Sequence, residues 1–343
     1  MTGQEFLSFL LNLHASMKIA IFSTHSYDKQ YLDEFNTGHE ITYFEVPLNE
    51  QTVVLTKGFD AVCIFVNDQA NEAILKTLTI NGIKLIVLRC AGFNNVDVKI
   101  ADNLGIAVVR VPAYSPEAVA EHALALILTL NRKTHKAYNR IREGNFSLEK
   151  LMGFNLHERK VAVIGTGSIG KAFCRILKGF GCKVAAYDIY PDQDLKESGV
   201  IYGSLKDTLA DADIVSLHCP LTDSTRHLIN EETLKLFKQG AMLINTSRGG
   251  LVHTADVIEA LKSGQLGFLG LDVYEQEANL FFRDFSEDII QDDLIARLIS
   301  FPNVLITSHQ GFFTKEAMEQ IAVISFMNID AFEKNEELVN RVG

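Results

Sequence analysis

Short apolar runs recur along the chain and alternate with longer stretches of mixed polarity. Each run is apolar without a break rather than at every second position, which is typical of strands buried on both faces of a sheet. Because these strands alternate with helical stretches, the pattern predicts βαβ units and parallel sheets. We expect the strands at 18–22, 61–66, 84–89, 160–165, 183–188, 213–218, 241–246, 268–273 and 303–308. The runs fall into two sets on either side of a long helical segment, so two sheets and two domains are predicted.

That helical segment begins at Ser115-Pro116-Glu117, where a serine N-cap is followed by proline in the first turn and then by an acid. It continues as one predicted helix to about Gly144, and its first half is apolar almost all round. A helix of this kind must be covered on more than one face. The pattern fits a core helix and a subunit contact equally well. A last helix, over 314–333, follows the final strand and would either stay with the second domain or cross back to the first.

The strand at 160–165 leads into the sequence GTGSIG, with glycines at Gly165, Gly167 and Gly170. Glycines at this spacing allow a tight turn, a close approach of the backbone to a pyrophosphate, and close packing of helix on strand. The start of the following helix offers N–H groups to the phosphates. Asp188 ends the next strand and would accept hydrogen bonds from ribose hydroxyls while repelling a 2′-phosphate. With no Arg or Lys at 189–191, the sequence predicts NAD rather than NADP; the alternative is a glycine-rich turn without a ligand.

Three later strands each run into polar residues: Arg248 after the strand at 241–246, Asp272 and Glu277 at the end of the next, and His309 after the last. Ligands bind at the carboxyl ends of strands in such sheets, so these residues are expected at the edge that holds the nucleotide. Taken singly, His309 could be a structural histidine, Arg248 a surface ion-pair member and Glu277 a solvated acid. Together they suit hydride transfer to a 2-keto acid, with Arg to orient the carboxylate, His to protonate the oxygen and a carboxylate to favour the imidazolium.

The motifs GTGSIG, LHCPLT, NTSRGG, LDVYEQE and SHQGFF, in this order, resemble the D-isomer-specific 2-hydroxyacid dehydrogenases. The resemblance covers nearly everything from Met17 onward. It implies two Rossmann- or flavodoxin-like doubly wound domains with a cleft between them. It also implies a discontinuous substrate domain at 17–114 and 313–343, and a NAD-binding domain at 115–312. Residues 1–16 lie outside the family pattern, and the strand-like run that opens at Met17 marks them as an N-terminal extension.

The resemblance further implies a role for each matching residue. His309 would be the acid–base, Glu277 its paired carboxylate and Arg248 the clamp for the substrate. Substrate contacts would come from Ala91, Gly92, Tyr114 and Phe312. Cofactor contacts would come from Gly165, Gly167, Ser168, Ile169, Gly170, Asp188, His218, Cys219, Pro220, Thr246 and Asp272, with Asp272 on the nicotinamide side.

Within the family, the stretches NLFFRDFSEDIIQDD and HQGFFT resemble the fermentative D-lactate dehydrogenases, and this resemblance implies pyruvate as substrate and D-lactate as product. Larger 2-keto acids stay open, because one methylene discriminates by only about 1–3 kcal/mol. A different kind of alternative is an NAD-sensing, corepressor-like binding protein. The family pairs its subunits through the helix that starts at Ser115, so a homodimer or homotetramer is expected. One departure from the family pattern is Gly311, where alanine is expected.

Composition narrows the partners. The formal net charge is −11, which disfavours nucleic acid and anionic membranes as partners. The five cysteines show no metal-ligand spacing, so no metal is expected, and their place in apolar runs suits a reducing compartment. Residues 1–16 lack the basic start of a secretory signal. We therefore expect a cytoplasmic protein with a small-molecule substrate.

Overall fold

The computed structural model describes residues 16–277 and 280–343. The chain divides into two compact units, the first running to Ser115 and resuming at Thr314–Gly343, the second spanning Pro116–Phe313. Residues 1–15, which make up nearly all of the expected extension, lie outside the described residues. Within the described ranges, no helix has the length and apolar character needed to cross a membrane.

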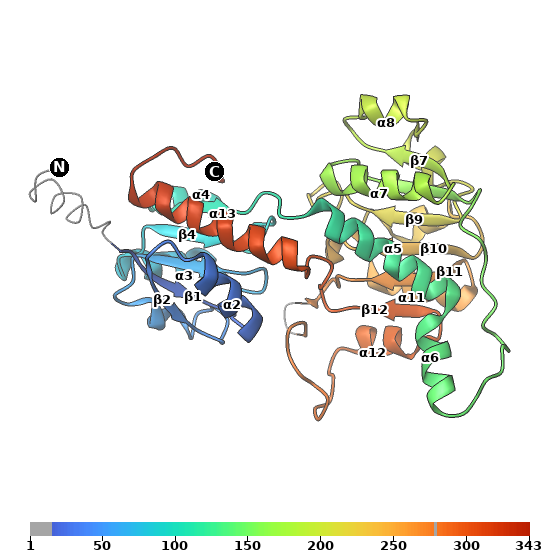
Figure 1. Ribbon diagram of the computed structural model, residues 1–343, viewed down its shortest axis with the longest axis horizontal. Coiled ribbons are helices and arrows are strands. Elements are labelled where there is room, and N and C mark those ends of the chain that lie inside the picture. Colours follow the sequence, from blue (N-terminus) through green and yellow to red (C-terminus); the bar gives the residue numbers. More distant parts are fainter. Residues whose placement is uncertain (1–15, 278–279) are drawn as a thin grey trace, which may run out of the picture. The chain divides into compact units, whose positions relative to one another are not determined.

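The first unit is built on a five-stranded sheet in the order β2-β1-β3-β4-β5, with every pair parallel. This is the flavodoxin-like order. Its strands are β1 (Lys18–Ile21), β2 (Glu40–Tyr43), β3 (Ala61–Ile64), β4 (Leu85–Leu88) and β5 (Ala107–Arg110). Its α-helices are α2 (Ser26–Phe35), α3 (Glu72–Ile80), α4 (Val98–Asn103) and α13 (Lys315–Glu333), drawn in Figure 1, and a 3₁₀ turn lies at Val53–Thr56.

The C-terminal helix α13 completes this unit. Phe326 and Ile329 of α13 are buried in one cluster with Ile19 and Ile21 of β1. Beyond the helix, the backbone of Asn340 and Val342 bonds to Arg110 and Val108, alongside β5. The last helix therefore packs on the first sheet, which settles the choice that the sequence pattern left open.

The second unit is built on a seven-stranded parallel sheet in the order β12-β11-β10-β9-β6-β7-β8. The run from β8 to β11 has the strand order of a Rossmann fold, extended by β12. Its strands are β6 (Lys160–Ile164), β7 (Lys183–Tyr187), β8 (Ile201–Tyr202), β9 (Ile214–Leu217), β10 (Ala241–Asn245), β11 (Leu266–Leu271) and β12 (Val304–Ile306). Its helices are α5 (Pro116–Arg132), α6 (Thr134–Arg142), α7 (Ser168–Gly179), α8 (Gln193–Glu197), α9 (Leu205–Leu209), α10 (Glu231–Leu234), the 3₁₀ helix η2 (Gly249–Leu251), α11 (Thr254–Ser263) and α12 (Asp293–Ser300). Two doubly wound parallel sheets confirm the predicted fold class.

Both faces of the larger sheet are covered, which explains the unbroken apolar runs. Val161 and Val163 of β6 belong to one core cluster, whereas Ala162 and Ile164 belong to another. Since neighbouring residues of a strand point to opposite faces, each face has its own core. In Figure 1, α5 and α7 lie along one side of this sheet.

The single helix predicted from Ser115 to Gly144 is wrong, because the structure breaks it at Lys133. Lys133 has a left-handed φ of 52° and separates α5 from α6. The break coincides with Asn131, whose side chain donates to the carbonyl oxygen of Phe154 (2.7 Å) and accepts from its N–H (2.8 Å). The side chain at 131 thus ties the end of α5 to a later segment, which the local pattern could not reveal.

The apolar surface of α5 is largely used inside its own unit. Ala123, Leu126, Ile127 and Leu130 are buried in the core cluster on one face of the sheet. Gly270 of β11 allows this close packing, because a Cβ there would stand 3.2 Å from Leu130 and clash with Ile244. Helix α5 is therefore a core helix.

Three strands, β2, β5 and β8, were not among those expected. Strand β2 is an edge strand of the first sheet and β8 an edge strand of the second. Both are only partly buried, so they lack the long apolar run of a central strand. The third, β5, is buried over Ala107–Val109, and its apolar run was a usable signal.

Arg89 anchors the segment that follows β4. Its side chain is 4% exposed, and its guanidinium donates to Asp28 Oδ1 at 3.0 Å. The same group donates to the carbonyl oxygens of Phe22 (3.1 Å) and Ser23 (2.6 Å). The buried ion pair and these hydrogen bonds hold the start of residues 90–92 against α2 and the loop that follows β1.

We expect Arg89→Ala to lower the free energy of unfolding by about 3–5 kcal/mol, because Asp28 would remain buried without its partner. The control is Arg341→Ala, which removes an ion pair with Asp102 whose side chains are 48% and 58% exposed. That loss should stay below about 1 kcal/mol. Urea unfolding followed by circular dichroism measures both, and equal losses would contradict this account of Arg89.

Candidate active site and nucleotide site

The glycine loop between β6 and α7 has the shape that the sequence predicted. Gly165 has a φ of 95°, and a Cβ at this position would lie 2.5 Å from the backbone nitrogen of Cys219. A Cβ at Gly170 would lie 2.1 Å from the carbonyl oxygen of Gly165. At Gly167, the N-cap of α7, a Cβ would meet nothing within 4 Å. The loop is therefore tightly packed at Gly165 and Gly170 and open at Gly167, where α7 begins. Next to Gly167, Ser168 is exposed and Ile169 is half-buried.

Asp188 directly follows β7 beside this loop. Its Oδ2 accepts from the N–H (2.6 Å) and the hydroxyl (3.1 Å) of Thr166, and its Oδ1 accepts from the N–H of Tyr190 (2.8 Å). A carboxylate oxygen has a second lone pair, so Asp188 keeps accepting capacity in a fixed orientation. This arrangement fits the predicted contact with ribose hydroxyls.

The loops after β9 and β10 carry the next residues that are predicted to contact the nucleotide. Burial lowers the pKa of His218 to about 3, so its imidazole is neutral, and its Nε2 lies 2.9 Å from Ser216 Oγ. Ser247 donates to the carbonyl oxygen of Cys219 at 2.7 Å, and Pro220 beyond it is exposed. Thr246 Oγ1 is buried and has no hydrogen-bond partner among the described residues. An orphaned hydroxyl on the same sheet edge as an open glycine loop fits a dinucleotide.

The acid–base pair lies at the ends of β11 and β12. His309 Nδ1 is 3.0 Å from Glu277 Oε1, with side chains 13% and 23% exposed. The other oxygen, Glu277 Oε2, accepts from the N–H of Tyr274 at 2.9 Å. The ring of Phe282 lies 6.1 Å from the ring of His309. With Nδ1 turned to the carboxylate, Nε2 is the nitrogen left for a substrate.

Asp272 directly follows β11 and is 1% exposed. Its Oδ1 accepts from Thr307 Oγ1 (2.6 Å) and from the N–H of Gln310 (2.9 Å), and its Oδ2 accepts from the N–H of Gly311 (2.8 Å). Burial raises the pKa of Asp272, but hydrogen bonds from His122, Thr307 and Gln310 outweigh burial and hold it below its ordinary value. The carboxylate therefore accepts hydrogen bonds from groups of the protein itself, and its contact with the nicotinamide stays a prediction.

Arg248 is held by the turn after β10. Asn245 Nδ2 donates to the carbonyl oxygen of Arg248 at 2.9 Å, and Arg248 Nη1 donates to that of Ser247 at 2.7 Å. At Gly249 a Cβ would stand 2.0 Å from the carbonyl oxygen of Tyr274, so only glycine allows this turn to lie against the loop after β11. Because β10, β11 and β12 are parallel neighbours, Arg248, Glu277 and His309 share one sheet edge.

The predicted substrate residues divide between the units. Ala91 and Gly92 follow β4 and Tyr114 follows β5, at the carboxyl edge of the first sheet. Within the described part of the chain, the N–H groups of Ala91 and Gly92 make no hydrogen bond. Phe312 belongs to the second unit and is buried. Their contacts with a substrate stay predictions.

Two residues near the acid–base pair were not predicted from the sequence: His122 on α5 and Thr307 after β12. His122 Nε2 lies 3.2 Å from Asp272 Oδ1 and 3.0 Å from Thr307 Oγ1. A signal was present, since a histidine interrupts an otherwise apolar helix. Its partner could not be read from the helix pattern.

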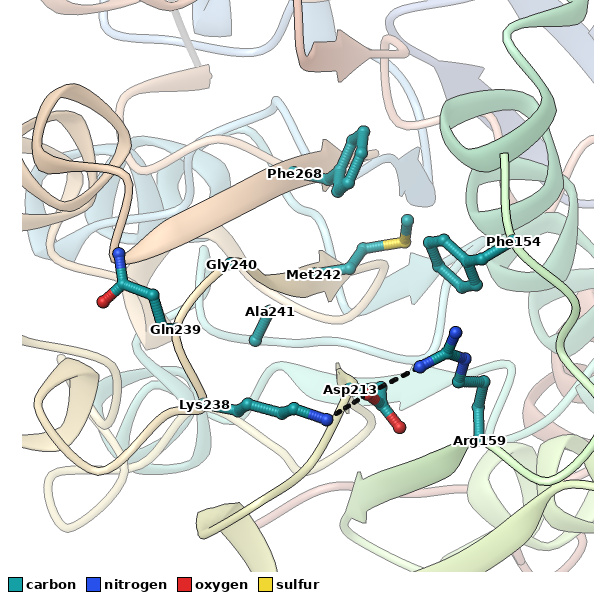
Figure 2. A pocket seen from close by; sticks show the side chains of 9 residues that line it. All are labelled: Phe154, Arg159, Asp213, Lys238, Gln239, Gly240, Ala241, Met242 and Phe268. Atoms are coloured by element: carbon teal, nitrogen blue, oxygen red, sulfur yellow. Dashed lines mark hydrogen bonds and ion pairs between the residues drawn. The ribbon is translucent and has the colours of Figure 1, made fainter. Parts of the chain in front are cut away.

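The hollow in Figure 2 lies at the opposite, amino edge of the larger sheet, at the starts of β9 and β10. It has a volume of about 260 Å³. Asp213 lies between Lys238 (2.7 Å) and Arg159 (3.4 Å). Burial raises the pKa of Asp213, but the hydrogen bonds from Lys238 and the Lys160 N–H, with the Arg159 charge, hold it below its ordinary value. These charges tie the sheet's amino edge together and take no part in the candidate site.

A Rossmann-ordered sheet with an open glycine loop, a ribose acid and a His–Glu pair on one edge defines a dinucleotide-dependent dehydrogenase. Residues 124–311 match the family described as D-isomer specific 2-hydroxyacid dehydrogenase, NAD binding domain. The 2-hydroxyacid dehydrogenase A of Aspergillus oryzae is 54% identical over 321 residues, covering 92% of each chain. The D-lactate dehydrogenase of Escherichia coli is 49% identical over 328 residues, covering 95% of this chain and 100% of that one.

Solved structures of similar enzymes support the same family. The pyruvate reductase of Chlamydomonas reinhardtii superposes with a TM-score of 0.90 at 45% identity, over 95% of this chain and 99% of that one. The apo structure of the E. coli D-lactate dehydrogenase gives 0.87 at 47% identity, over 95% and 100%. The chain belongs to the D-isomer-specific 2-hydroxyacid dehydrogenases, and NAD is its cofactor.

We expect Glu277→Gln to lower kcat/KM for keto-acid reduction by about 10- to 100-fold, because the ring of His309 loses the carboxylate that fixes its orientation through Nδ1. Steady-state kinetics with NADH and pyruvate measures this. The control is Glu275→Gln, which alters a similar pair with His227 (2.6 Å) in the same unit and should leave kcat/KM within about twofold of the wild-type value. A near-normal kcat/KM in Glu277→Gln would contradict the proposed pairing.

Proposed function

We propose that this chain reduces pyruvate to D-lactate with NADH, and catalyses the reverse reaction. The observation that carries the proposal is the His309–Glu277 pair at 3.0 Å, on the same sheet edge as Arg248 and the glycine loop. The relatives named D-lactate dehydrogenase and pyruvate reductase, at 45–49% identity, support pyruvate over a larger keto acid. A D-2-hydroxyisocaproate dehydrogenase is more distant, at 32% identity.

When bound, NADH supplies the hydride, and the side chains of this chain do the remaining work. Arg248 holds the substrate carboxylate with its planar guanidinium and polarises the carbonyl. His309 gives a proton from Nε2 to the carbonyl oxygen as negative charge develops there. Glu277 fixes the ring through Nδ1 and stabilises the imidazolium before that transfer.

In lactate oxidation the same groups act in reverse, with His309 accepting the hydroxyl proton.

The aromatic residues near the His309–Glu277 pair would restrict the room for the substrate side chain. Phe282 lies beside His309, whereas Phe281 is buried in the core of the second unit. The roles of Ala91, Gly92, Tyr114 and Phe312 stay as the family resemblance gives them. A cytoplasmic location also stays a prediction.

The test is NADH oxidation by the purified chain with pyruvate, 2-ketobutyrate and 2-ketoisocaproate, followed by an enantiomer-specific assay of the product. Pyruvate should give the highest kcat/KM, and the product should be D-lactate. A preference for the branched acid would keep the family and overturn the substrate. Tight NADH binding without turnover of any keto acid would instead favour the binding-protein alternative, which the comparisons do not support.

We also propose that the chain forms a homodimer through α6 and the segment after it, rather than through the apolar face of α5. Every residue from 141 to 150 is exposed. This surface carries large apolar side chains at Tyr138, Ile141, Phe146, Leu148 and Met152, with Met152 88% exposed. Exposed apolar side chains in such number favour a protein partner, and a second copy is the commonest one.

In sedimentation velocity, the wild-type chain should run as a dimer or a multiple of it, and Phe146→Ser with Met152→Ser should shift it toward the monomer. The control is Ile289→Ser, which removes an equally exposed apolar residue (81%) elsewhere in the second unit. A monomeric wild-type chain, or no difference between the variants, would contradict the proposed surface.

A further inference from the structure

His122 lies on α5 and points to the carboxylate that organises the end of β12. Its Nε2 is 3.2 Å from Asp272 Oδ1 and 3.0 Å from Thr307 Oγ1, and its side chain is 16% exposed. Its Cδ2 lies 3.4 Å from the position that a Cβ of Gly311 would occupy. The ring therefore packs against the backbone of the segment that carries His309.

The chemistry of the partners fixes the direction of these hydrogen bonds. The Thr307 hydroxyl lies 2.6 Å from Asp272 Oδ1 and gives its proton to that carboxylate. Its lone pairs, like those of Asp272, can then only accept. His122 Nε2 must carry the proton that both oxygens share. This makes His122 a donor through Nε2.

Asp272 in turn holds the five residues from 307 to 311. The N–H groups of Gln310 and Gly311 donate to its two carboxylate oxygens, and the N–H of His309 donates to its carbonyl oxygen at 2.7 Å. His309 has a φ of 50°, a left-handed conformation that is unfavourable for a residue with a Cβ. The hydrogen bonds on either side are what keep His309 in that conformation.

We propose that His122 is a positioning residue for His309, acting through Asp272. By donating to Asp272 Oδ1 and Thr307 Oγ1, it helps keep the buried carboxylate ionised and in place. The carboxylate then fixes residues 307–311 and aims the imidazole of His309. The consequence for catalysis rests on the proposed function, whereas the consequence for residues 307–311 does not.

A histidine that merely filled space in the core would behave differently. Its loss would weaken the packing of α5 as a whole and would be repaired by any side chain of similar size. A positioning donor depends instead on a proton at the place of Nε2. Glutamine puts its amide nitrogen at about that place, and asparagine, one methylene shorter, does not. His122→Gln and His122→Asn are therefore a matched pair, with His122→Leu as the variant that lacks any donor.

The first readout is hydrogen exchange, which needs no activity. In His122→Leu and His122→Asn, a peptide spanning 307–312 should exchange faster, because the amides of Gln310 and Gly311 lose the fixed carboxylate that accepts from them. Peptides from β4 and β7 should exchange as in the wild-type chain, and His122→Gln should restore the slow exchange. Equal acceleration in all peptides would show a general structural role and overturn the proposal. So would unchanged exchange over 307–312.

The second readout is the split between kcat and KM for pyruvate. His122→Leu and His122→Asn should lose about 10- to 100-fold in kcat, the size expected from a displaced reacting group. The KM for pyruvate should change by less than about twofold, because Arg248 is untouched, and His122→Gln should recover most of kcat. A raised KM with normal kcat, or no rescue by glutamine, would contradict the assignment. If the wild-type chain does not turn over pyruvate, the proposed function fails, and hydrogen exchange still decides the role of His122.

Discussion

A single buried carboxylate, that of Asp272, organises the end of the larger sheet where the acid–base pair lies. Burial of an unpaired charge is unfavourable by several kcal/mol, so such a group persists only where donors surround it. Here the donors are two side chains and two backbone N–H groups, all but one from the segment 307–311. The need to satisfy one charge therefore fixes the path of the chain on both sides of His309. Glu277, five residues after Asp272 in the loop that follows β11, then contacts Nδ1 of His309.

The parallel arrangement of the strands explains why these groups meet the nucleotide site at all. In the second unit every paired strand runs in the same direction, so the loop after each strand emerges at one edge. The glycine loop and Asp188 follow β6 and β7, whereas Arg248 and His309 follow β10 and β12. Glycine allows the tightest approaches: Gly165 against the end of β9, and Gly249 against Tyr274. The fold thus supplies a common edge, and a few positions without a Cβ allow its loops to lie close together.

Much of this could be predicted from the sequence, because the central strands and the motifs that follow them are local patterns. The glycine spacing, Asp188 and the three polar strand ends needed only the direction of a parallel strand to be placed together. The features that the sequence did not predict depend on contacts between residues far apart in the chain, or on strands at the edges of the sheets. The break at Lys133 depends on Asn131 meeting Phe154, and the outer strands β2 and β8 are too exposed to form an apolar run. His122 looked like part of an apolar helix because its partner, Asp272, lies far along the chain. The buried side chains of α5 pack on its own sheet, and the expectation that subunits pair through the helix starting at Ser115 stays a prediction.

The central claim is that His309, held by Asp272 and paired with Glu277, is the group that exchanges a proton with the substrate oxygen. The most direct measurement is a crystal structure of the chain with NADH and oxamate, an amide with the shape of pyruvate. The account predicts His309 Nε2 within hydrogen-bond distance, about 2.6–3.2 Å, of the oxamate oxygen that replaces the keto oxygen. It also predicts the oxamate carboxylate on Arg248, with Nδ1 of His309 still on Glu277. An oxamate oxygen bound by another side chain, with His309 out of reach, would contradict the account.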